Sequence, residues 1–220
     1  MTDRTVKQPP RWFYQVARTV VITFCKIWFR VSYEGTDRLP ATGSYVVAPI
    51  HRSNIDTFVV GCMTRRRLRF MAKDSLWKVK PLAVFIETVG GFPVRRGTAD
   101  VEAIKTALGL LRDEPVVLFP EGARQTGPIV QPLFDGAVYV AAKAGVPIVP
   151  VGVGGSERCM PKGSKLVYPY KIHVIVGDPI APPAMIGRRV DRAELAKTTE
   201  ELSNALQALF DAAQIRAGVR

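Results

Sequence analysis

The sequence is poor in histidine and cysteine, and this shortage excludes two classes of site. Only two histidine and three cysteine residues occur among 220 residues. An odd number of widely separated cysteine residues does not make a disulfide framework, so we expect a reducing compartment. Because no set of Cys and His residues has zinc-ligand spacing, we also expect no metal site.

Long apolar runs are missing as well. The longest uncharged stretch near the N-terminus is "TVVITFC", between Arg18 and Lys26, whereas a membrane-spanning helix needs about 20 mostly apolar residues. No small-residue cleavage site follows, so we expect no signal peptide. The stretch "GGSER" at 154–158 lacks the closing glycine of a serine nucleophile elbow.

Acidic residues are few compared with basic ones. The chain has 31 Lys and Arg against 19 Asp and Glu, a net charge of +12. Such a surplus favours a polyanionic partner, which is a nucleic acid, an anionic membrane surface or a phosphorylated substrate. A nucleic-acid-binding module is suggested by charge alone, since no RNP-like or P-loop pattern occurs, and we expect no nucleic acid partner.

The N-terminal part predicts an amphipathic helix. Six polar or basic residues gather in an arc of about 120° on a helical projection; they are Arg11, Gln15, Arg18, Thr19, Lys26 and Arg30. Apolar and aromatic residues fill the rest, which is typical of a helix lying in a membrane interface. The alternative is a helix packed on its own domain. We predict a membrane-associating helical segment over residues 1–34 and a second domain over residues 35–220.

The remaining chain alternates short β-rich runs with helical patterns. Strands are predicted at 45–50, 68–73, 91–95, 115–120, 146–153 and 170–177, and helices at 54–64, 76–88, 99–113, 135–144 and 192–215. The last helix begins with "DRAE", a capping sequence. This alternation predicts an α/β fold with a mixed, largely parallel sheet flanked by helices.

The stretch "IHRSNID" (50–56) follows the first of these strands and places a histidine five residues before an aspartate. Two side chains at this spacing point about 140° apart on one regular helix. They meet if His51 lies in the loop and Asp56 in the first turn of the next helix, and the carboxylate then orients a general base. The alternative is a capping box with Ser53 as N-cap and Asp56 as its partner.

Two further stretches place arginine beside glycine. In "GGFPVRRG" (90–97) the arginines follow an extended segment, and their planar guanidinium groups suit phosphate. In "FPEGAR" (119–124), Glu121 and Arg124 lie after an apolar strand, where α/β sheets place their ligands. Solvated arginines in the first stretch and a Glu121–Arg124 salt bridge in the second are the alternatives.

Taken together and in order, these stretches resemble the glycerolipid acyltransferase family typified by 1-acylglycerol-3-phosphate acyltransferases. "HRSNID" matches the HxxxxD motif, "GGFPVRRG" the glycine–aromatic–arginine block, "FPEGAR" the FPEGTR block and "VPIVPVGV" (146–153) the closing apolar–proline block. The resemblance covers roughly residues 35–180. It implies His51 and Asp56 as catalytic residues, and a substrate site formed by Lys73, Arg96, Glu121, Gly122 and Arg124.

The resemblance also implies the partners. A lysophospholipid would accept an acyl group from acyl-CoA or acyl carrier protein as cosubstrate, with no other cofactor, at the cytoplasmic face of the cell membrane. Ala123, Gln125, Asp135 and Arg95 depart from common family residues, so other acceptors stay open: glycerol 3-phosphate, another lysophospholipid or a glycolipid. A catalytically inactive lipid-binding relative is the remaining alternative.

Overall fold

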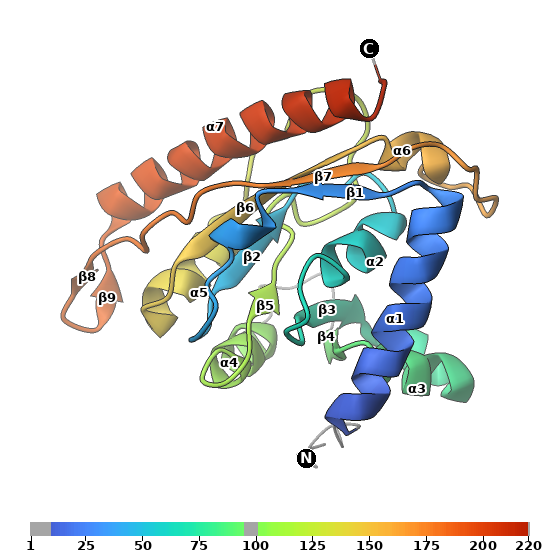
Figure 1. The fold of residues 1–220 in the computed structure, drawn as a ribbon. Helices are drawn as coiled ribbons and strands as arrows, with labels where there is room; N and C mark the ends of the chain where they lie inside the picture. Colours follow the sequence, from blue (N-terminus) through green and yellow to red (C-terminus); the bar gives the residue numbers. More distant parts are fainter. Residues whose placement is uncertain (1–9, 95–100, 220) are drawn as a thin grey trace.

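A computed structural model describes residues 10–94 and 101–219 (Figure 1). Its main feature is a seven-stranded sheet with strand order β1-β7-β6-β2-β5-β3-β4. The strands are β1 (Ser32–Glu34), β2 (Val46–Pro49), β3 (Arg69–Lys73), β4 (Gly91–Val94), β5 (Val116–Val117), β6 (Ile148–Gly154) and β7 (His173–Val176). A separate hairpin pairs β8 (Met185–Ile186) with β9 (Arg189–Val190).

The sheet is mixed and largely parallel, as predicted. The strands from β6 to β4 run parallel to one another, with β2 between β6 and β5. β7 is antiparallel to β6, and β1 is parallel to β7. All residues of β2 and β6 are buried, which explains their continuous apolar sequences, because strands covered on both faces show no polar alternation.

Helices cover both faces of the sheet (Figure 1). They are α1 (Arg11–Trp28), α2 (Ile55–Gly61), α3 (Lys80–Thr88), α4 (Val101–Leu110), α5 (Gly136–Ala144), α6 (Ser156–Cys159) and α7 (Arg192–Arg216). Two short 3-10 helices, Thr36–Arg38 and Asp74–Lys78, lie between strands and helices. α7 lies along β6 and β7, while α1 packs beside α2 and α3 at the other side of the molecule.

Two glycine residues of β6 allow α7 to lie directly on the sheet. A Cβ atom added to Gly152 would lie 2.4 Å from the Leu209 carbonyl oxygen, and one added to Gly154 would lie 2.1 Å from that of Ala213. α7 begins with the cap that the sequence "DRAE" predicts. The Asp191 side chain accepts hydrogen bonds from the first-turn amides of Ala193 and Glu194. Its buried side presents Leu202, Leu206 and Phe210 to the sheet.

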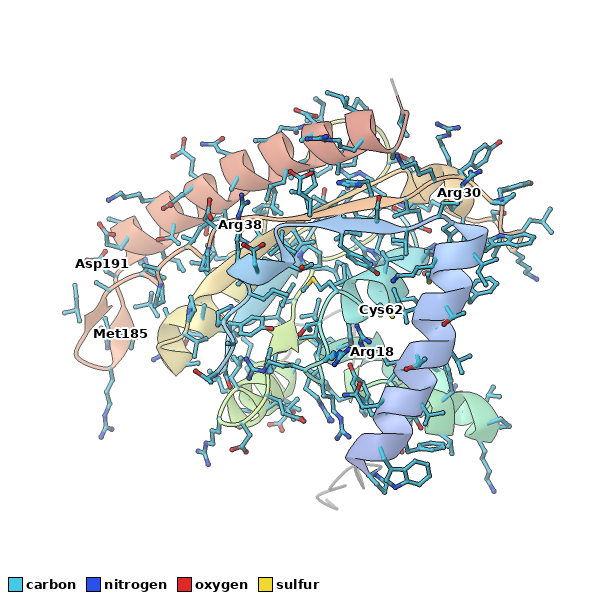
Figure 2. All side chains as sticks on the ribbon, viewed as in Figure 1. Arg18, Arg30, Arg38, Cys62, Met185 and Asp191 are labelled. Carbon is cyan, nitrogen blue, oxygen red and sulfur yellow. The ribbon has the colours of Figure 1, made fainter. Side chains whose placement is uncertain are left out.

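α1 is attached to the domain partly through its polar residues. Arg18 donates from Nε to the Thr64 carbonyl oxygen at 2.6 Å and from Nη2 to that of Cys62 at 2.7 Å (Figure 2). Tyr14 and Cys25 of the same helix are buried, and so is Phe29, the residue after its last turn. Within residues 10–94 and 101–219, no helix is both long and apolar enough to cross a bilayer. The predicted division at residue 34 stays a prediction, and β1, just before it, belongs to the main sheet.

Candidate active site

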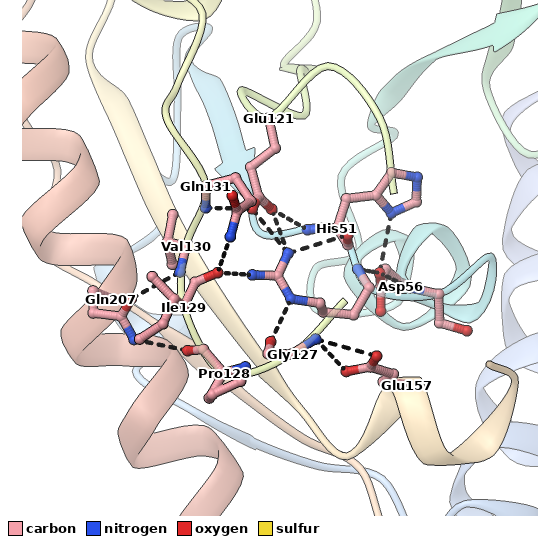
Figure 3. Close-up of polar contacts among 12 residues, drawn as sticks. His51, Asp56, Glu121, Gly127, Pro128, Ile129, Val130, Gln131, Glu157 and Gln207 are labelled. Atoms are coloured by element: carbon pink, nitrogen blue, oxygen red, sulfur yellow. Dashed lines mark hydrogen bonds and ion pairs between the residues drawn. The ribbon is translucent and has the colours of Figure 1, made fainter. Parts of the chain in front are cut away.

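The predicted meeting of His51 and Asp56 occurs at the junction of β2 and α2. β2 ends at Pro49 and α2 begins at Ile55, so His51 lies in the connecting loop and Asp56 in the first helical turn. The His51 Nδ1 atom lies 3.0 Å from Asp56 Oδ2 (Figure 3). Asp56 is fully buried and His51 is 9% exposed. The loop therefore supplies the geometry that a single helix could not.

One carboxylate oxygen of Asp56 serves both of the roles considered for it. Besides the His51 ring, Oδ2 accepts hydrogen bonds from the backbone N–H groups of Arg52 and Ser53, each at 2.7 Å. The bond from Ser53 is the backbone half of a capping box, although the N-cap is Asn54 and not the predicted Ser53. Because Oδ2 accepts, Nδ1 carries the hydrogen of the neutral imidazole, and its other nitrogen, Nε2, is left as a base.

An apolar cavity of about 280 Å³ lies beside the His51 ring. The Phe119 ring stacks on the imidazole, with ring centroids 4.0 Å apart, and both residues line the cavity. Its other walls come mainly from β3, β5, α4 and α5 and include Met71, Ala103, Ile104, Val117, Phe134 and Val140. The site thus joins one oriented nitrogen base to a hydrocarbon-lined space.

Glu121 is buried and pairs with Arg52 instead of Arg124. Arg52 Nη1 lies 2.9 Å and 2.7 Å from the two Glu121 carboxylate oxygens. These oxygens also accept the backbone N–H groups of His51 at 3.1 Å and Gln131 at 3.0 Å (Figure 3). The salt bridge considered between Glu121 and Arg124 is therefore wrong, because the carboxylate points into the protein.

Arg52 holds three segments around this carboxylate. Its Nε donates to the Gly127 carbonyl oxygen at 3.1 Å and its Nη2 to that of Ile129 at 3.0 Å. The guanidinium carbon lies 4.9 Å from the centroid of the Phe210 ring of α7. The sequence analysis did not single out Arg52, although it is the residue after His51. The arginine ties the histidine loop to the 119–131 segment and to the long helix.

Of the other predicted substrate residues, Gly122 lines the cavity, and Arg124 is not among the residues that form its walls. Gly122 lines it in a left-handed conformation (φ +68°), and an added Cβ would lie 2.8 Å from the Phe134 ring. Arg124 is half-buried, and no residue of the described ranges forms an ion pair with it. Lys73 is the last residue of β3, and its side chain is outside what the structure describes. Arg96 lies outside the described residues.

The second histidine and the cysteine residues lie elsewhere. His173 Nδ1 is 2.7 Å from Ser32 Oγ and its Nε2 is 3.4 Å from Glu34, which joins β7 to β1. Burial raises the pKa of the Cys25 and Cys159 thiols to about 12 and that of Cys62 to about 11, so these thiols stay protonated at neutral pH. Among the described residues, no cluster of three or more His, Cys, Asp or Glu side chains is arranged as a metal site.

Comparison with known proteins gives one consistent result. Residues 30–154 match the Acyltransferase family. The 1-acyl-sn-glycerol-3-phosphate acyltransferase of Bacillus subtilis (strain 168) is 29% identical over 175 residues, which cover 79% of this chain and 84% of that protein. The chloroplastic BAT2 protein of Brassica napus, of the same activity name, is 26% identical over 158 residues, 70% of this chain and 46% of that protein.

The fold has a close counterpart among solved structures. The crystal structure of the 1-acyl-sn-glycerophosphate (LPA) acyltransferase PlsC from Thermotoga maritima aligns with a TM-score of 0.72 at 23% identity, covering 98% of this chain and 84% of that chain. The present chain therefore spans most of the two bacterial relatives, and less than half of the plant protein. From its matched sequence and its fold, the chain belongs to the Acyltransferase family and is an O-acyltransferase.

Proposed function

We propose that this acyltransferase transfers a fatty acyl group from a thioester donor to the free hydroxyl of 1-acyl-sn-glycerol 3-phosphate, making phosphatidic acid for phospholipid synthesis. One observation carries the proposal: the His51 imidazole is held by Asp56 at 3.0 Å while its ring borders an apolar cavity. The name of the Bacillus subtilis relative, 1-acyl-sn-glycerol-3-phosphate acyltransferase, supports this choice of acceptor.

The proposed reaction is a direct transfer. His51 Nε2 takes the proton of the acceptor hydroxyl, and the oxygen attacks the thioester carbonyl carbon. The resulting tetrahedral species collapses with cleavage of the carbon–sulfur bond, and the departing thiolate takes the proton back from the imidazolium. Asp56 stabilises that imidazolium and holds the Nδ1–H tautomer. General-base assistance of this kind contributes about 10²–10⁴-fold in rate.

The cavity beside His51 supports a role in binding an acyl chain. Its walls are hydrocarbon side chains, and its volume of about 280 Å³ matches a segment of an alkyl chain better than a charged headgroup. Gly122 and Phe134 are packed against each other at its edge. An acyl chain entering between the sheet and α5 would bring its thioester carbon next to the imidazole.

We propose that basic side chains bind the phosphate of the acceptor. Arg124 is half-buried close in sequence to Gly122, and it is free of ion pairs among the described residues, so its guanidinium is available for the acceptor phosphate. Lys73 and Arg96 complete the proposed set by their family positions. Glu121 was predicted to line the acceptor site, but its oxygens already accept four hydrogen bonds. We therefore assign it to positioning His51.

The proposed partners are the acyl donor and a lipid surface. Acyl-CoA and acyl carrier protein stay equal candidates for the donor, and we propose that no further cofactor takes part. On α1, seven apolar side chains are exposed; they are Trp12, Phe13, Val16, Val20, Phe24, Ile27 and Trp28. An exposed apolar stripe of this length on an ordered helix is typical of an interfacial helix. We propose peripheral attachment through α1, at the cytoplasmic face, where free thiols such as these persist.

The decisive experiment combines two substitutions with a panel of acceptors. Purified enzyme is offered 1-acylglycerol 3-phosphate, glycerol 3-phosphate and a neutral lysophospholipid, each with acyl-CoA and with acyl carrier protein. We expect His51→Ala to lower kcat by about 10²-fold or more with unchanged folding. Arg124→Ala should raise the KM for the acceptor and leave the KM for the donor unchanged. The control, Arg189→Ala on the β8–β9 hairpin, should change neither KM.

Three results would count against the proposal. Full turnover by the His51 variant would remove the histidine from the chemistry. Equal effects of Arg124→Ala on both substrates would remove Arg124 from the phosphate site. A clear preference for glycerol 3-phosphate or the neutral lysophospholipid would show that the enzyme is an acyltransferase with a different acceptor from the one proposed.

A further inference from the structure

The segment between α6 and β7 has an unusual composition. Residues 161–171, "PKGSKLVYPYK", contain three lysine and two tyrosine residues and no acidic residue; we name this segment the basic loop. It lies beside the C-terminal end of α1 (Figure 1), where Arg30 Nη2 donates to the Pro169 carbonyl oxygen at 2.8 Å. The loop is thus continuous with the end of the exposed apolar stripe.

The tip of the basic loop exposes apolar side chains. Leu166 is 64% exposed, and Val167, Tyr168 and Tyr170 are each about 40% exposed. Single exposed apolar residues are ordinary, but several neighbours on one loop form a patch of the kind that contacts a partner. Leucine, valine and tyrosine suit the boundary between headgroups and acyl chains, because tyrosine has an apolar ring and a polar end.

Two hydrogen bonds and one ring contact attach the basic loop to α6. The Tyr168 N–H donates to the Cys159 carbonyl oxygen at 2.7 Å, and the Cys159 thiol donates to the Tyr170 carbonyl oxygen at 3.2 Å. The Arg158 guanidinium carbon lies 4.4 Å from the centroid of the Tyr170 ring. These contacts fix the loop at Tyr168 and Tyr170, while the neighbouring side chains of Leu166 and Val167 are exposed.

The charged residues within the basic loop are all lysines. Lys162, Lys165 and Lys171 are exposed, and none of them forms an ion pair with a described residue. The acidic residue closest in sequence, Glu157, directs its carboxylate at the backbone N–H of Gly127. Three uncompensated lysines around an apolar tip are complementary to anionic headgroups above acyl chains.

We propose that the basic loop is a second membrane-contacting element, with its tip inserted among the headgroups of anionic lipids. This inference rests on the membrane attachment proposed for α1. Because α1 is fixed to the domain, a contact through α1 alone lets the whole molecule roll about the helix axis, whereas a second contact at one end fixes the rotation. α1 and the loop lie on the same side of the molecule (Figure 1), so one flat surface can contact both.

A probe on the tip tests insertion directly. Cys25, Cys62 and Cys159 are buried, so an environment-sensitive fluorophore attached through Leu166→Cys labels that position selectively. Ile186→Cys on the β8–β9 hairpin, 67% exposed and on the opposite side of the molecule, is the matched control. With vesicles of phosphatidylcholine and phosphatidylglycerol, we expect a blue shift and brighter emission at 166 and an unchanged spectrum at 186.

Charge removal tests the electrostatic half of the inference. In a cosedimentation assay at low salt, Lys162→Gln/Lys165→Gln/Lys171→Gln should weaken binding to the anionic vesicles by roughly fivefold per lysine, about 100-fold in total. The control, Lys105→Gln/Arg192→Gln/Lys197→Gln, removes three positive charges from α4 and α7 and should weaken binding far less.

The outcomes separate this inference from the function it rests on. Vesicle binding with a silent probe at 166, or equal losses in the two triple variants, would overturn the role of the basic loop and leave α1 as the attachment. A wild-type chain that does not bind anionic vesicles at all would overturn both membrane contacts. Neither result bears on the proposed acyl transfer, because the activity assay uses dispersed substrates and tests the chemistry independently of membrane binding.

Discussion

Arg52 is the residue on which the geometry of the site depends most. It is the largest fully buried side chain in the described ranges, and burying an arginine has a high desolvation cost unless it is paired and hydrogen-bonded. Here Glu121 neutralises it, and the carbonyl groups of Gly127, Ile129 and His51 accept hydrogen bonds from its Nε, Nη2 and Nη1 atoms. Since Glu121 also accepts the His51 backbone N–H, the pair fixes the loop that carries the base.

Replacing one member of the Arg52–Glu121 pair should destabilise the protein more than replacing both members together. We expect Arg52→Met or Glu121→Leu alone to lower the free energy of unfolding by about 3–5 kcal/mol, because each leaves a buried charge unpaired. The double variant should be less destabilised than the sum of the two single variants. Urea unfolding of the four proteins measures the coupling, and kcat in each should fall as the His51 loop loses its support.

Additive destabilisation would contradict this account, since it would mean that the guanidinium and the carboxylate stabilise the fold independently. Asp211→Ala provides a control for the substitutions. Asp211 is an exposed acid on the same helix as Phe210, and its carboxylate oxygen contacts only Gln207 among the described residues. A change there should be close to neutral, within about 0.5 kcal/mol.

Sequence reasoning predicted Asp56 but not Arg52, for a physical reason. The spacing of His51 and Asp56 limits where both can lie, so a strand before them and a helix after them bring them together. An arginine has no local signal for burial, because most arginine side chains are solvated. Its partner comes from a segment about 70 residues later, and only the tertiary fold brings the two together. For the same reason Glu121 was first assigned to the substrate.

At the scale of elements, the contact between β6 and α7 determines how the C-terminal third folds. Gly152 and Gly154 let the helix backbone lie against the strand, with no room for a side chain between them. This close approach places Phe210 over the Arg52 guanidinium. The strand was predicted from its apolar residues, but the reason for its glycines lies in the helix that covers it.

Alanine substitutions at two glycine positions should therefore have opposite effects. Gly154→Ala places a methyl group 2.1 Å from a backbone carbonyl oxygen, so we expect a loss of about 1–3 kcal/mol or more in the free energy of unfolding. Gly109→Ala, in α4 with no atom within 4 Å of its added Cβ, should stabilise the protein by about 0.5–1 kcal/mol. Thermal and urea unfolding measure both, and equal effects would contradict the proposed close contact.

Prediction of the elements was accurate where long apolar patterns mark them and poor for short pieces. The predicted helix at 192–215 differs from α7 by one residue. The strand predicted at 115–120 is only Val116–Val117, because the chain turns at Phe119 to form the site. β1 and the β8–β9 hairpin were missed, since two or three residues are too few to show a period.

On the scale of the whole molecule, one side of α1 packs on the domain and the other side is exposed. Composition alone does not predict which residues lie on each side. Two residues of the predicted polar arc, Gln15 and Arg18, bond to backbone carbonyl groups of the domain. The helix therefore packs on the domain with one side and exposes its apolar stripe on the other. The interpretation of a helix packed on its own domain thus holds for one face, and the membrane interface stays a prediction for the exposed face.

This arrangement decides how attachment through α1 should be tested. Deleting the helix would remove Tyr14 and Cys25 from the core, so a loss of binding would be confounded by unfolding. Val20→Ser/Phe24→Ser/Ile27→Ser changes only exposed residues of the stripe. The matched control is Met185→Ser/Ile186→Ser/Ile215→Ser, which removes three exposed apolar side chains from other surfaces.

We expect the α1 variant to bind anionic vesicles on the order of 100-fold more weakly than the wild type, because three apolar side chains no longer enter the interface. It should keep its unfolding midpoint and its activity toward a short-chain acceptor dispersed as monomers. Raising the salt concentration should weaken the remaining binding further, since the residual attraction comes from the net charge of +12. If the two triple variants lose binding equally, general surface hydrophobicity and not α1 holds the enzyme at the membrane.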